Sequence, residues 1–82
     1  MAKVFQVGIY SREQILYEGE VVSLIVPSVS GYLGVLADHA PVVAKLAAGK
    51  ITLRLATGQT NVIDSSSNGF LQVLKNQVTL LL

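Results

Sequence analysis

The sequence predicts an all-β fold, a flattened sandwich or barrel of about eight to ten short strands. Apolar and polar residues alternate repeatedly along the chain, whereas a helical period is hard to find. Turn residues separate the apolar runs at intervals of about 8–12 residues, the spacing typical of sandwiches and barrels. A chain of 82 residues is long enough for one domain, so residues 1–82 are predicted to form a single unit.

The alternation predicts individual strands. Apolar residues alternate with mostly polar ones in residues 5–10, 51–56 and 77–82, which gives each segment one face for a core. Residues 21–26 form a nearly continuous aliphatic run, interrupted by Ser23, and predict a strand buried on both faces. The predicted core contains Phe5, Val7, Ile9, Val21, Leu24, Val26, Ile51, Leu53, Leu55, Leu71, Val73, Val78 and Leu80.

Short polar segments predict the connections between strands. Hairpin turns are expected at residues 11–13, 18–20, 57–59 and 75–77, and the Thr57-Gly58 pair is the clearest of them. Residues 65–69 predict a longer polar connection. A single helical turn at most is expected near residues 38–41.

Composition excludes several classes of function. The six Lys and Arg residues are scattered rather than clustered, which argues against nucleic-acid binding. The absence of cysteine excludes thiol chemistry. The sequence contains no run of about 18 apolar residues, so no membrane span is predicted. Charged residues make up 13% of the chain, about half of the usual share, which favours burial of part of the surface by a partner. The alternative is a weakly charged surface rich in Ser, Thr, Asn and Gln.

The titratable residues do not predict a reaction centre. One histidine and five scattered carboxylates do not supply a metal site. Ser65, His39 and Asp38 are the residue types of a hydrolase triad, but a nucleophile elbow is missing and Asp38 is adjacent to His39 in sequence. We therefore expect no catalytic residue, no cofactor and no metal. His39 is expected to pin its loop through a hydrogen bond to Asp38 or to a backbone carbonyl.

The most specific segment is residues 27–41, which contains the single histidine and both prolines. Its glycines and prolines are typical of a complex turn in a β-sheet. The order Gly-Tyr-Leu-Gly-Val-Leu-Ala-Asp-His-Ala-Pro within it resembles the signature loop of the epsilon subunit of F-type ATP synthases. Residues 7–13, 19–21, 22–27, 68–73 and 76–81 are also similar to that family, in the same order, so the resemblance covers essentially the whole chain. Ala37-Asp38 stands where the family usually has Pro-Gly, Asn68 where glycine is usual, and Tyr32 where a polar or acidic residue is common.

The resemblance implies a non-catalytic, ten-stranded β-sandwich domain. Such a domain lies at the foot of the central stalk, between the gamma subunit and the ring of c subunits. It helps to lock gamma to the ring, so that rotation driven by protons or sodium ions reaches catalytic sites on other subunits. The implied location is peripheral, on the cytoplasmic side of a bacterial membrane or the stromal side of a thylakoid membrane, and attached through the complex alone.

The same resemblance implies two sets of contact residues. Contacts with the c-ring are expected at Ser28, Val29, Ser30, Gly31, Tyr32 and Leu33, with the Tyr32 ring at a loop tip. Contacts with gamma are expected at Ser11, His39, Ala40, Val42 and Ala44.

Other classes of function stay open on the residues alone. A β-sandwich adaptor that binds a protein or a carbohydrate is one, with Tyr10, Tyr17 and Tyr32 as the aromatic candidates; a small hydrolase that depends on His39 is another. Members of the resembled family commonly continue into two helices that can inhibit ATP hydrolysis or help to bind ATP. The sequence ends at Leu82, where that pair would begin, so no ATP-regulated switch is expected within it.

Overall fold

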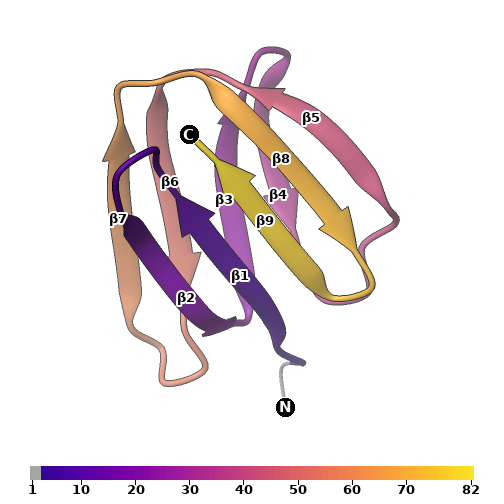
Figure 1. Ribbon diagram of the computed structural model, residues 1–82. Coiled ribbons are helices and arrows are strands. Elements are labelled where there is room, and N and C mark those ends of the chain that lie inside the picture. The colour runs from indigo at the N-terminus through magenta and orange to yellow at the C-terminus, as the bar shows by residue number, and fades with distance from the viewer. Residues whose placement is uncertain (1–2) are drawn as a thin grey trace.

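The structure is a computed structural model that describes residues 3–82, and it is all-β as predicted (Figure 1). Met1 and Ala2, which belong to the predicted domain, lie outside the described residues. Nine strands occur in the described part of the chain, within the range that the alternation predicts and one fewer than the resemblance implies. They are β1 Phe5–Tyr10, β2 Ile15–Val21, β3 Ser23–Ser28, β4 Gly31–Val35, β5 Val42–Leu46, β6 Gly49–Arg54, β7 Thr60–Ser65, β8 Gly69–Leu74 and β9 Gln77–Leu81. Between residues 3 and 82, no helix is long and apolar enough to cross a membrane.

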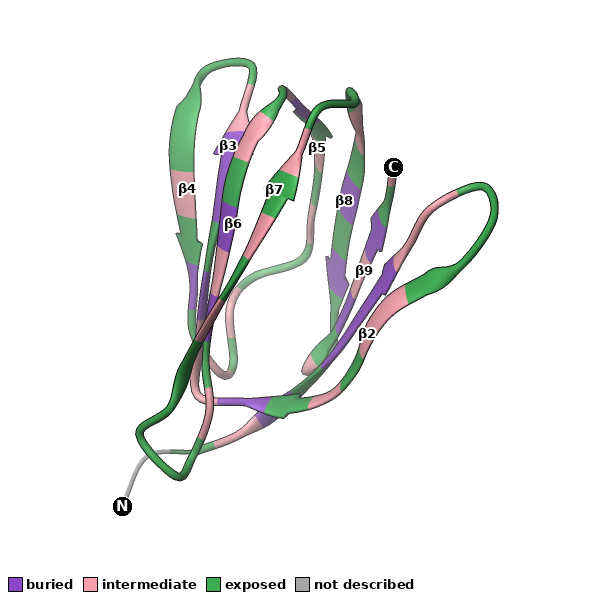
Figure 2. Cartoon of the chain, turned by 90° about the vertical axis from the view of Figure 1, so that its left-hand side faces the viewer, coloured by how far each residue is buried: buried purple, intermediate pink, exposed green. Residues whose placement is uncertain are grey.

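The strands form one curled sheet that folds into two facing layers. The hydrogen-bonded order is β2-β1-β9-β8-β5-β3-β6-β7, and β4 pairs with β3 outside this path. β1 and β9 are parallel, and the other pairings are antiparallel. The pairing of Ser28 with Leu46 joins β3 to β5, where the sheet turns from one layer to the other. Figure 2 shows the β1 layer (β2, β1, β9, β8 and β5) facing the β3 layer (β4, β3, β6 and β7).

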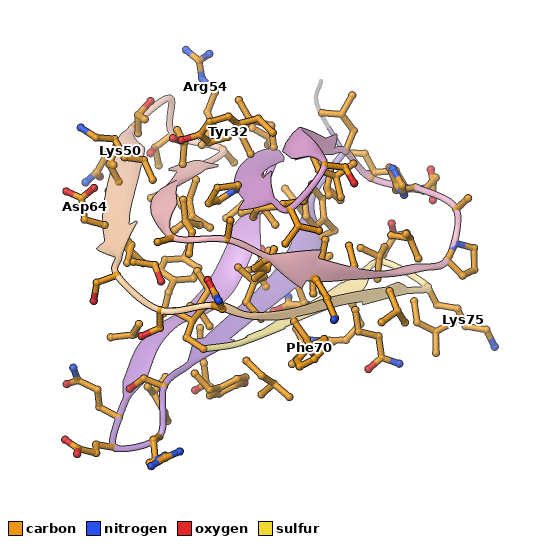
Figure 3. All side chains as sticks on the ribbon, turned by 90° about the horizontal axis from the view of Figure 1, so that it is seen from above. Tyr32, Lys50, Arg54, Asp64, Phe70 and Lys75 are labelled. Atoms are coloured by element: carbon orange, nitrogen blue, oxygen red, sulfur yellow. The ribbon has the colours of Figure 1, made fainter. Side chains whose placement is uncertain are left out.

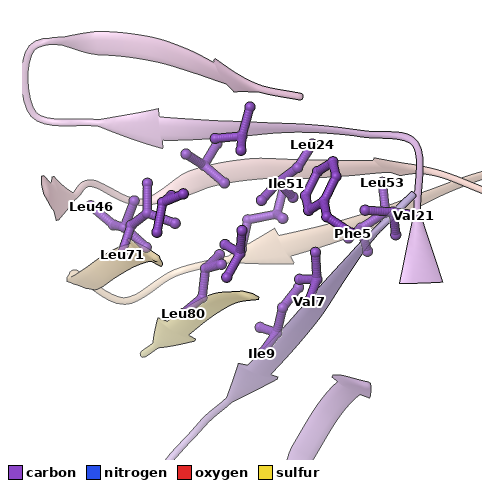
Figure 4. Packing of buried hydrophobic residues seen from close by; sticks show 14 residues of the cluster. Phe5, Val7, Ile9, Val21, Leu24, Leu46, Ile51, Leu53, Leu71 and Leu80 are labelled. Carbon is purple, nitrogen blue, oxygen red and sulfur yellow. The ribbon is translucent and has the colours of Figure 1, made fainter. Parts of the chain in front are cut away.

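The hydrophobic core lies between the two layers, where both sheets turn their apolar faces inward (Figure 4). Nearly all of the predicted core residues are buried there, and Leu55 is half-buried against the same cluster. Val35 and Leu46 are buried core residues that the alternation did not identify. Each ends a short strand, β4 or β5, whose sequence does not alternate cleanly.

The predicted turn at residues 18–20 is wrong. These residues lie inside β2, where Gly19 pairs with Val7 of β1. A Cβ at Gly19 would lie 3.0 Å from the Tyr17 hydroxyl oxygen. Gly19 therefore makes room for the Tyr17 ring along the strand, which is a packing role for glycine in a strand rather than a turn role.

The aliphatic run of residues 21–26 is not one strand buried on both faces. β2 ends at Val21, the chain bends at Val22, and β3 begins at Ser23 in the opposite layer. Ile25 is 45% exposed, so β3 is not buried on both faces at this position, although Pro27 farther along the same face is buried. The bend lets Val21 and Leu24 enter the core from different layers, and the Val22 amide donates to the Arg54 carbonyl at 2.8 Å.

The other predicted connections are found. Residues 11–14 join β1 to β2, residues 55–59 join β6 to β7, and residues 66–68 join β7 to β8. Lys75 and Asn76 form a two-residue turn between β8 and β9. Residues 36–41 contain a turn but no helix, and the His39 amide donates to the Leu36 carbonyl at 3.3 Å.

Candidate functional site

The hairpin between β3 and β4 contains the residues that the resemblance assigns to the c-ring. Ser28 ends β3 and Gly31 begins β4, so Val29 and Ser30 form a two-residue turn. The Ser28 hydroxyl donates to the Gly31 carbonyl and accepts from the Ser30 amide. The Val29 amide donates to the Lys45 carbonyl at 3.1 Å, which ties the turn to β5. These bonds fix the hairpin, and Val29 at its tip is 65% exposed.

Tyr32 does not lie at a loop tip, contrary to the prediction. It lies in β4, directly opposite Pro27 of β3, and its hydroxyl oxygen is 3.2 Å from where a Cβ of Gly49 would be. Side chains alternate along a strand, so Leu33 packs toward the core while Tyr32 takes the outer face. The Tyr32 ring therefore extends over Pro27, which is buried, toward β6. Figure 3 shows Tyr32 on the outer side of its layer, the side that also carries Lys50.

A hollow of about 390 Å³ opens beside the hairpin. Val29 contributes the hairpin side, and β5, β8 and the residue before β8 contribute Lys45, Leu46, Asn68, Gly69 and Phe70. Sequence reasoning missed Lys45 and Phe70 as surface residues of this end. They lie outside the loop that carries the resemblance, and the pairing of β5 with β8 is what places them opposite each other.

His39 lies half-buried in the connection of residues 36–41. Its Nδ1 atom is 2.7 Å from the Ala40 carbonyl oxygen, so Nδ1 carries a proton and donates to that oxygen. The ring thus hydrogen-bonds a backbone carbonyl, one of the two expected arrangements. The Asp38 carboxylate contacts Lys3 and Asn76 instead.

The predicted gamma contacts lie at two ends of the sandwich. Ser11 follows β1 and bonds Gln14 across the turn, through its amide at 2.9 Å and through its hydroxyl. The Tyr10 carbonyl, next to Ser11, accepts a hydrogen bond from the Leu82 amide, and Leu82 lies against Gly69. Gly69 pairs with Leu46, and Leu46 pairs with Ser28 of the β3–β4 hairpin. Ser11 therefore lies at the same end of the sandwich as this hairpin. His39 and Ala40 lie at the opposite end, beside the β8–β9 turn. A single partner that touches both sites must extend along the β1 layer.

Two of the predicted gamma contacts, Val42 and Ala44, face inward. Both lie in β5 and pack against the core cluster, so their side chains are partly covered by the protein itself. Val43 lies between them and is 71% exposed. Because strand side chains point alternately to opposite faces, Val43 presents the outer side of β5. The sequence signal was ambiguous, since residues 42–44 are all apolar.

The outer side of the β1 layer carries a set of exposed apolar side chains. The strand register places Ile15 opposite Tyr10, Tyr10 opposite Leu81, and Leu81 opposite Phe70, which makes a row across four strands. We call the exposed members of this side the outer apolar face: Ile15, Val43, Phe70, Leu74 and Leu81. The row across four strands is typical of a protein contact surface, and Gln72 and Gln77 lie opposite Val43 and Leu74 on the same face.

The described residues do not assemble a reaction centre. Between residues 3 and 82, no three His, Cys, Asp or Glu side chains lie together as metal ligands. The residues of the hypothetical triad do not lie together. Ser65 pairs with Gly49 near the β3–β4 hairpin, and its hydroxyl donates to the Ser67 carbonyl. His39 lies at the other end of the sandwich.

The three tyrosines do not form a common aromatic platform. Tyr10 lies over Gly8 on the outer side of β1, Tyr17 packs against the core from β2, and Tyr32 lies on the other layer. Tyr10 donates a 2.7 Å hydrogen bond to the Glu18 carboxylate, and this bond to a charged acceptor raises the pKa of Tyr10. Carbohydrate binding by stacked aromatic rings would need open ring faces near one another, and these rings lie on separate surfaces.

Comparisons with known proteins agree on one family. Residues 4–82 match the family described as ATP synthase, Delta/Epsilon chain, beta-sandwich domain. An ATP synthase epsilon chain of Leptospira borgpetersenii is 41% identical over 80 residues, covering 98% of this chain and 61% of the relative. One of Dichelobacter nodosus is 37% identical over 81 residues, covering 99% of this chain and 56% of the relative. This chain therefore spans about three fifths of the length of these relatives.

Solved structures show the same fold. A chain in the cryo-EM structure of the Euglena gracilis mitochondrial ATP synthase, which comprises OSCP, F1 and the c-ring, superposes with a TM-score of 0.85 at 22% identity. That match covers 92% of this chain and 48% of the other. A chain of the central stalk and c-ring structure from Tetrahymena thermophila gives a TM-score of 0.75 at 13% identity, with 93% and 60% covered.

Proposed function

The chain belongs to the family of ATP synthase delta/epsilon chain β-sandwich domains, and from that membership we propose that it is a non-catalytic part of the central stalk. It links the gamma subunit to the c-ring of an F-type ATP synthase, so that ion flow is coupled to ATP synthesis. The observation that carries this proposal is the family match over residues 4–82. The complex holds it at the membrane, on the side that faces the bacterial cytoplasm or the plastid stroma.

The architecture suits the transmission of torque. Two sheets share one close-packed apolar core, and interiors packed in this way resist compression and transmit strain. The task requires stiffness and complementary surfaces rather than a reaction centre. The β3–β4 hairpin and the outer apolar face supply two such surfaces.

The β3–β4 hairpin is the proposed contact with the c-ring. Val29 projects from a turn that is fixed by hydrogen bonds to Ser28 and to β5, so little conformational freedom is lost when a partner docks. The hollow beside the hairpin is a candidate binding site, lined by the apolar side chain of Phe70 and the cationic side chain of Lys45. This combination suits a loop that offers an apolar side chain next to a carboxylate.

The gamma subunit is proposed to pack along the outer apolar face, which adjoins the proposed c-ring contact at Phe70. This surface spans the layer between the two ends, with Ile15 following the turn that contains Ser11 and Leu74 preceding the β8–β9 turn beside His39. It includes Val43, whereas the sequence predicted its neighbours Val42 and Ala44. Ser11, His39 and Ala40 stay in the proposed contact set. Val42 and Ala44 contribute indirectly, because they hold β5 against the core.

Binding of purified gamma subunit to the chain tests the proposal. Val43→Glu is expected to weaken binding by about tenfold or more, because a carboxylate would be buried without a partner in an apolar contact. Val62→Glu is the matched control, since Val62 is 53% exposed on the outer side of the β3 layer. Equal affinities for the two variants would exclude the outer apolar face as the gamma site, and no binding by the unmodified chain would exclude the proposed function.

Tyr32 tests the contact with the c-ring. Tyr32→Ala is expected to reduce ATP-driven ion pumping in vesicles that contain the whole complex, while the domain stays folded. The ring is 65% exposed beside the hairpin and offers a large amphipathic contact area. Tyr32→Phe keeps the ring over Pro27 and removes the hydroxyl, so it distinguishes the contribution of the hydroxyl from that of the ring. Unchanged coupling in Tyr32→Ala vesicles, with circular dichroism showing an intact sandwich, would contradict this contact.

A further inference from the structure

We propose that Asp38 and Asn76 are positioning residues that hold the His39 connection, residues 36–41, in one conformation for docking of the gamma subunit. The inference rests on the proposed function, because it assigns a task to side chains beside the proposed gamma site. It concerns a contact between residues 38 positions apart in the chain.

The two residues bind each other through two hydrogen bonds of opposite direction. The Asp38 amide donates to Asn76 Oδ1 at 2.6 Å, and Asn76 Nδ2 donates to Asp38 Oδ1 at 2.9 Å. Two bonds between the same pair fix both distance and orientation, whereas a single bond would allow rotation. Lys3 adds a 2.7 Å ion pair to Asp38 Oδ2, so three separate segments of the chain meet at this carboxylate.

Both residues of the pair have a left-handed backbone conformation. Asp38 has φ of +63°, and Asn76 has φ of +59° in the two-residue turn between β8 and β9. Glycine adopts this left-handed region most easily, and it is the preferred second residue of such a hairpin turn. Asparagine and aspartate tolerate the conformation and, unlike glycine, bring side chains that can bind each other. Asp38 occupies the position where the resembled family usually has glycine.

Asn76 is a firm anchor because the sheet holds its backbone. Its carbonyl accepts a 2.9 Å hydrogen bond from the Gln6 amide of β1, and Gln77 then continues into β9. The connection has its own internal bonds, from the His39 amide to Leu36 and from the His39 ring to Ala40. The Asp38–Asn76 pair therefore joins an internally bonded turn to a rigid sheet edge.

The electrostatics support an ionised Asp38. The hydrogen bonds from Lys3 and then from Asn76 lower the pKa of Asp38, so its carboxylate keeps both acceptor oxygens at neutral pH. The Lys3 ion pair joins two well-exposed side chains, and pairs of that kind contribute little to stability. The positioning effect is thus assigned to Asn76 rather than to Lys3.

A fixed connection lowers the entropic cost of docking. A partner that meets an ordered His39 and Ala40 does not have to order them itself, which slows its dissociation. Three single variants separate this role from a contribution to folding: Asn76→Gly, Asp38→Ala and Asp38→Asn. Asn76→Gly removes the amide while placing the best residue in the turn, and Asp38→Asn keeps an oxygen that can accept from Asn76.

The experiment measures dissociation of purified gamma subunit, exchange of the backbone amide hydrogen of residue 38 and the urea midpoint of each variant of the 82-residue chain. In Asn76→Gly and Asp38→Ala, gamma is expected to dissociate roughly two- to tenfold faster. The backbone amide of residue 38 is expected to exchange roughly tenfold faster, because Asn76→Gly removes its acceptor and Asp38→Ala removes the second bond that fixes its position. The urea midpoint of Asn76→Gly stays close to that of the unmodified chain. Asp38→Asn and the control Lys3→Ala keep dissociation within about twofold of the unmodified chain.

The outcomes are distinguishable. If the unmodified chain does not bind gamma, the proposed function and this inference both fail. If it binds gamma and Asn76→Gly dissociates at the same rate despite faster exchange at Asp38, the inference alone is overturned. Failure of Asp38→Asn to restore slow dissociation would assign the effect to charge instead of the paired hydrogen bonds, which also overturns it.

Discussion

Leu53→Ala is expected to lower the free energy of unfolding by about 2–5 kcal/mol. Leu53 is fully buried in β6, where it pairs with Leu24 and packs in the core between the two layers (Figure 4). Truncation removes apolar contacts and leaves a cavity that close-packed neighbours fill only in part. A domain of this size is stable by about 4–12 kcal/mol, so the loss is a large share of the total. Urea unfolding measures the change.

Leu36→Ala is the matched control for this substitution. Leu36 is 63% exposed, and the same truncation there is expected to change stability by less than about 0.5 kcal/mol. A Leu53→Ala shift equivalent to less than about 1 kcal/mol would show that β6 does not supply a central core residue.

The strands with one buried face were predictable from the sequence because alternation follows directly from that geometry. Phe5, Val7 and Ile9 of β1 are buried as the period-2 pattern predicts, and β9 repeats the pattern with Val78 and Leu80. The prediction of one doubly buried strand at residues 21–26 was wrong for a physical reason. A chain that crosses from one layer to the other buries residues on both sides of the bend, and this resembles a strand buried on both faces.

The surfaces were predictable only in part. Although strand β4 within it was missed, the turn-rich segment of residues 27–41 could be located from its own glycines, serines and prolines, since a turn depends on local conformation. The face of β5 could not, because residues 42–44 are apolar throughout and the inward residues are set by the register with β8. The Asp38–Asn76 pair depends on a contact across 38 positions, for which a single sequence holds no local signal.

Gly69 is where an added methyl group is expected to damage the sheet most directly. Gly69 begins β8 beside the end of β9, and a Cβ built on it would overlap the Leu81 carbonyl oxygen. It would also come within 3.0 Å of the Leu81 carbonyl carbon and the Leu82 Cα. These are backbone atoms, so no change of side-chain rotamer relieves the overlap. The ends of β8 and β9 must separate instead.

Gly69→Ala is accordingly expected to cost about 1–3 kcal/mol of stability, the range for overpacking that forces backbone shifts. Gly34→Ala is the matched control, because Gly34 also lies in a strand and no neighbouring atom lies within 4 Å of its Cβ position. That control should be neutral, or more stable by up to about 1 kcal/mol, since alanine restricts the unfolded chain. Urea midpoints measure both, and hydrogen exchange at the Leu82 amide, which bonds Tyr10, locates the damage. If Gly69→Ala is as stable as Gly34→Ala, the close approach of β9 to Gly69 does not constrain this position.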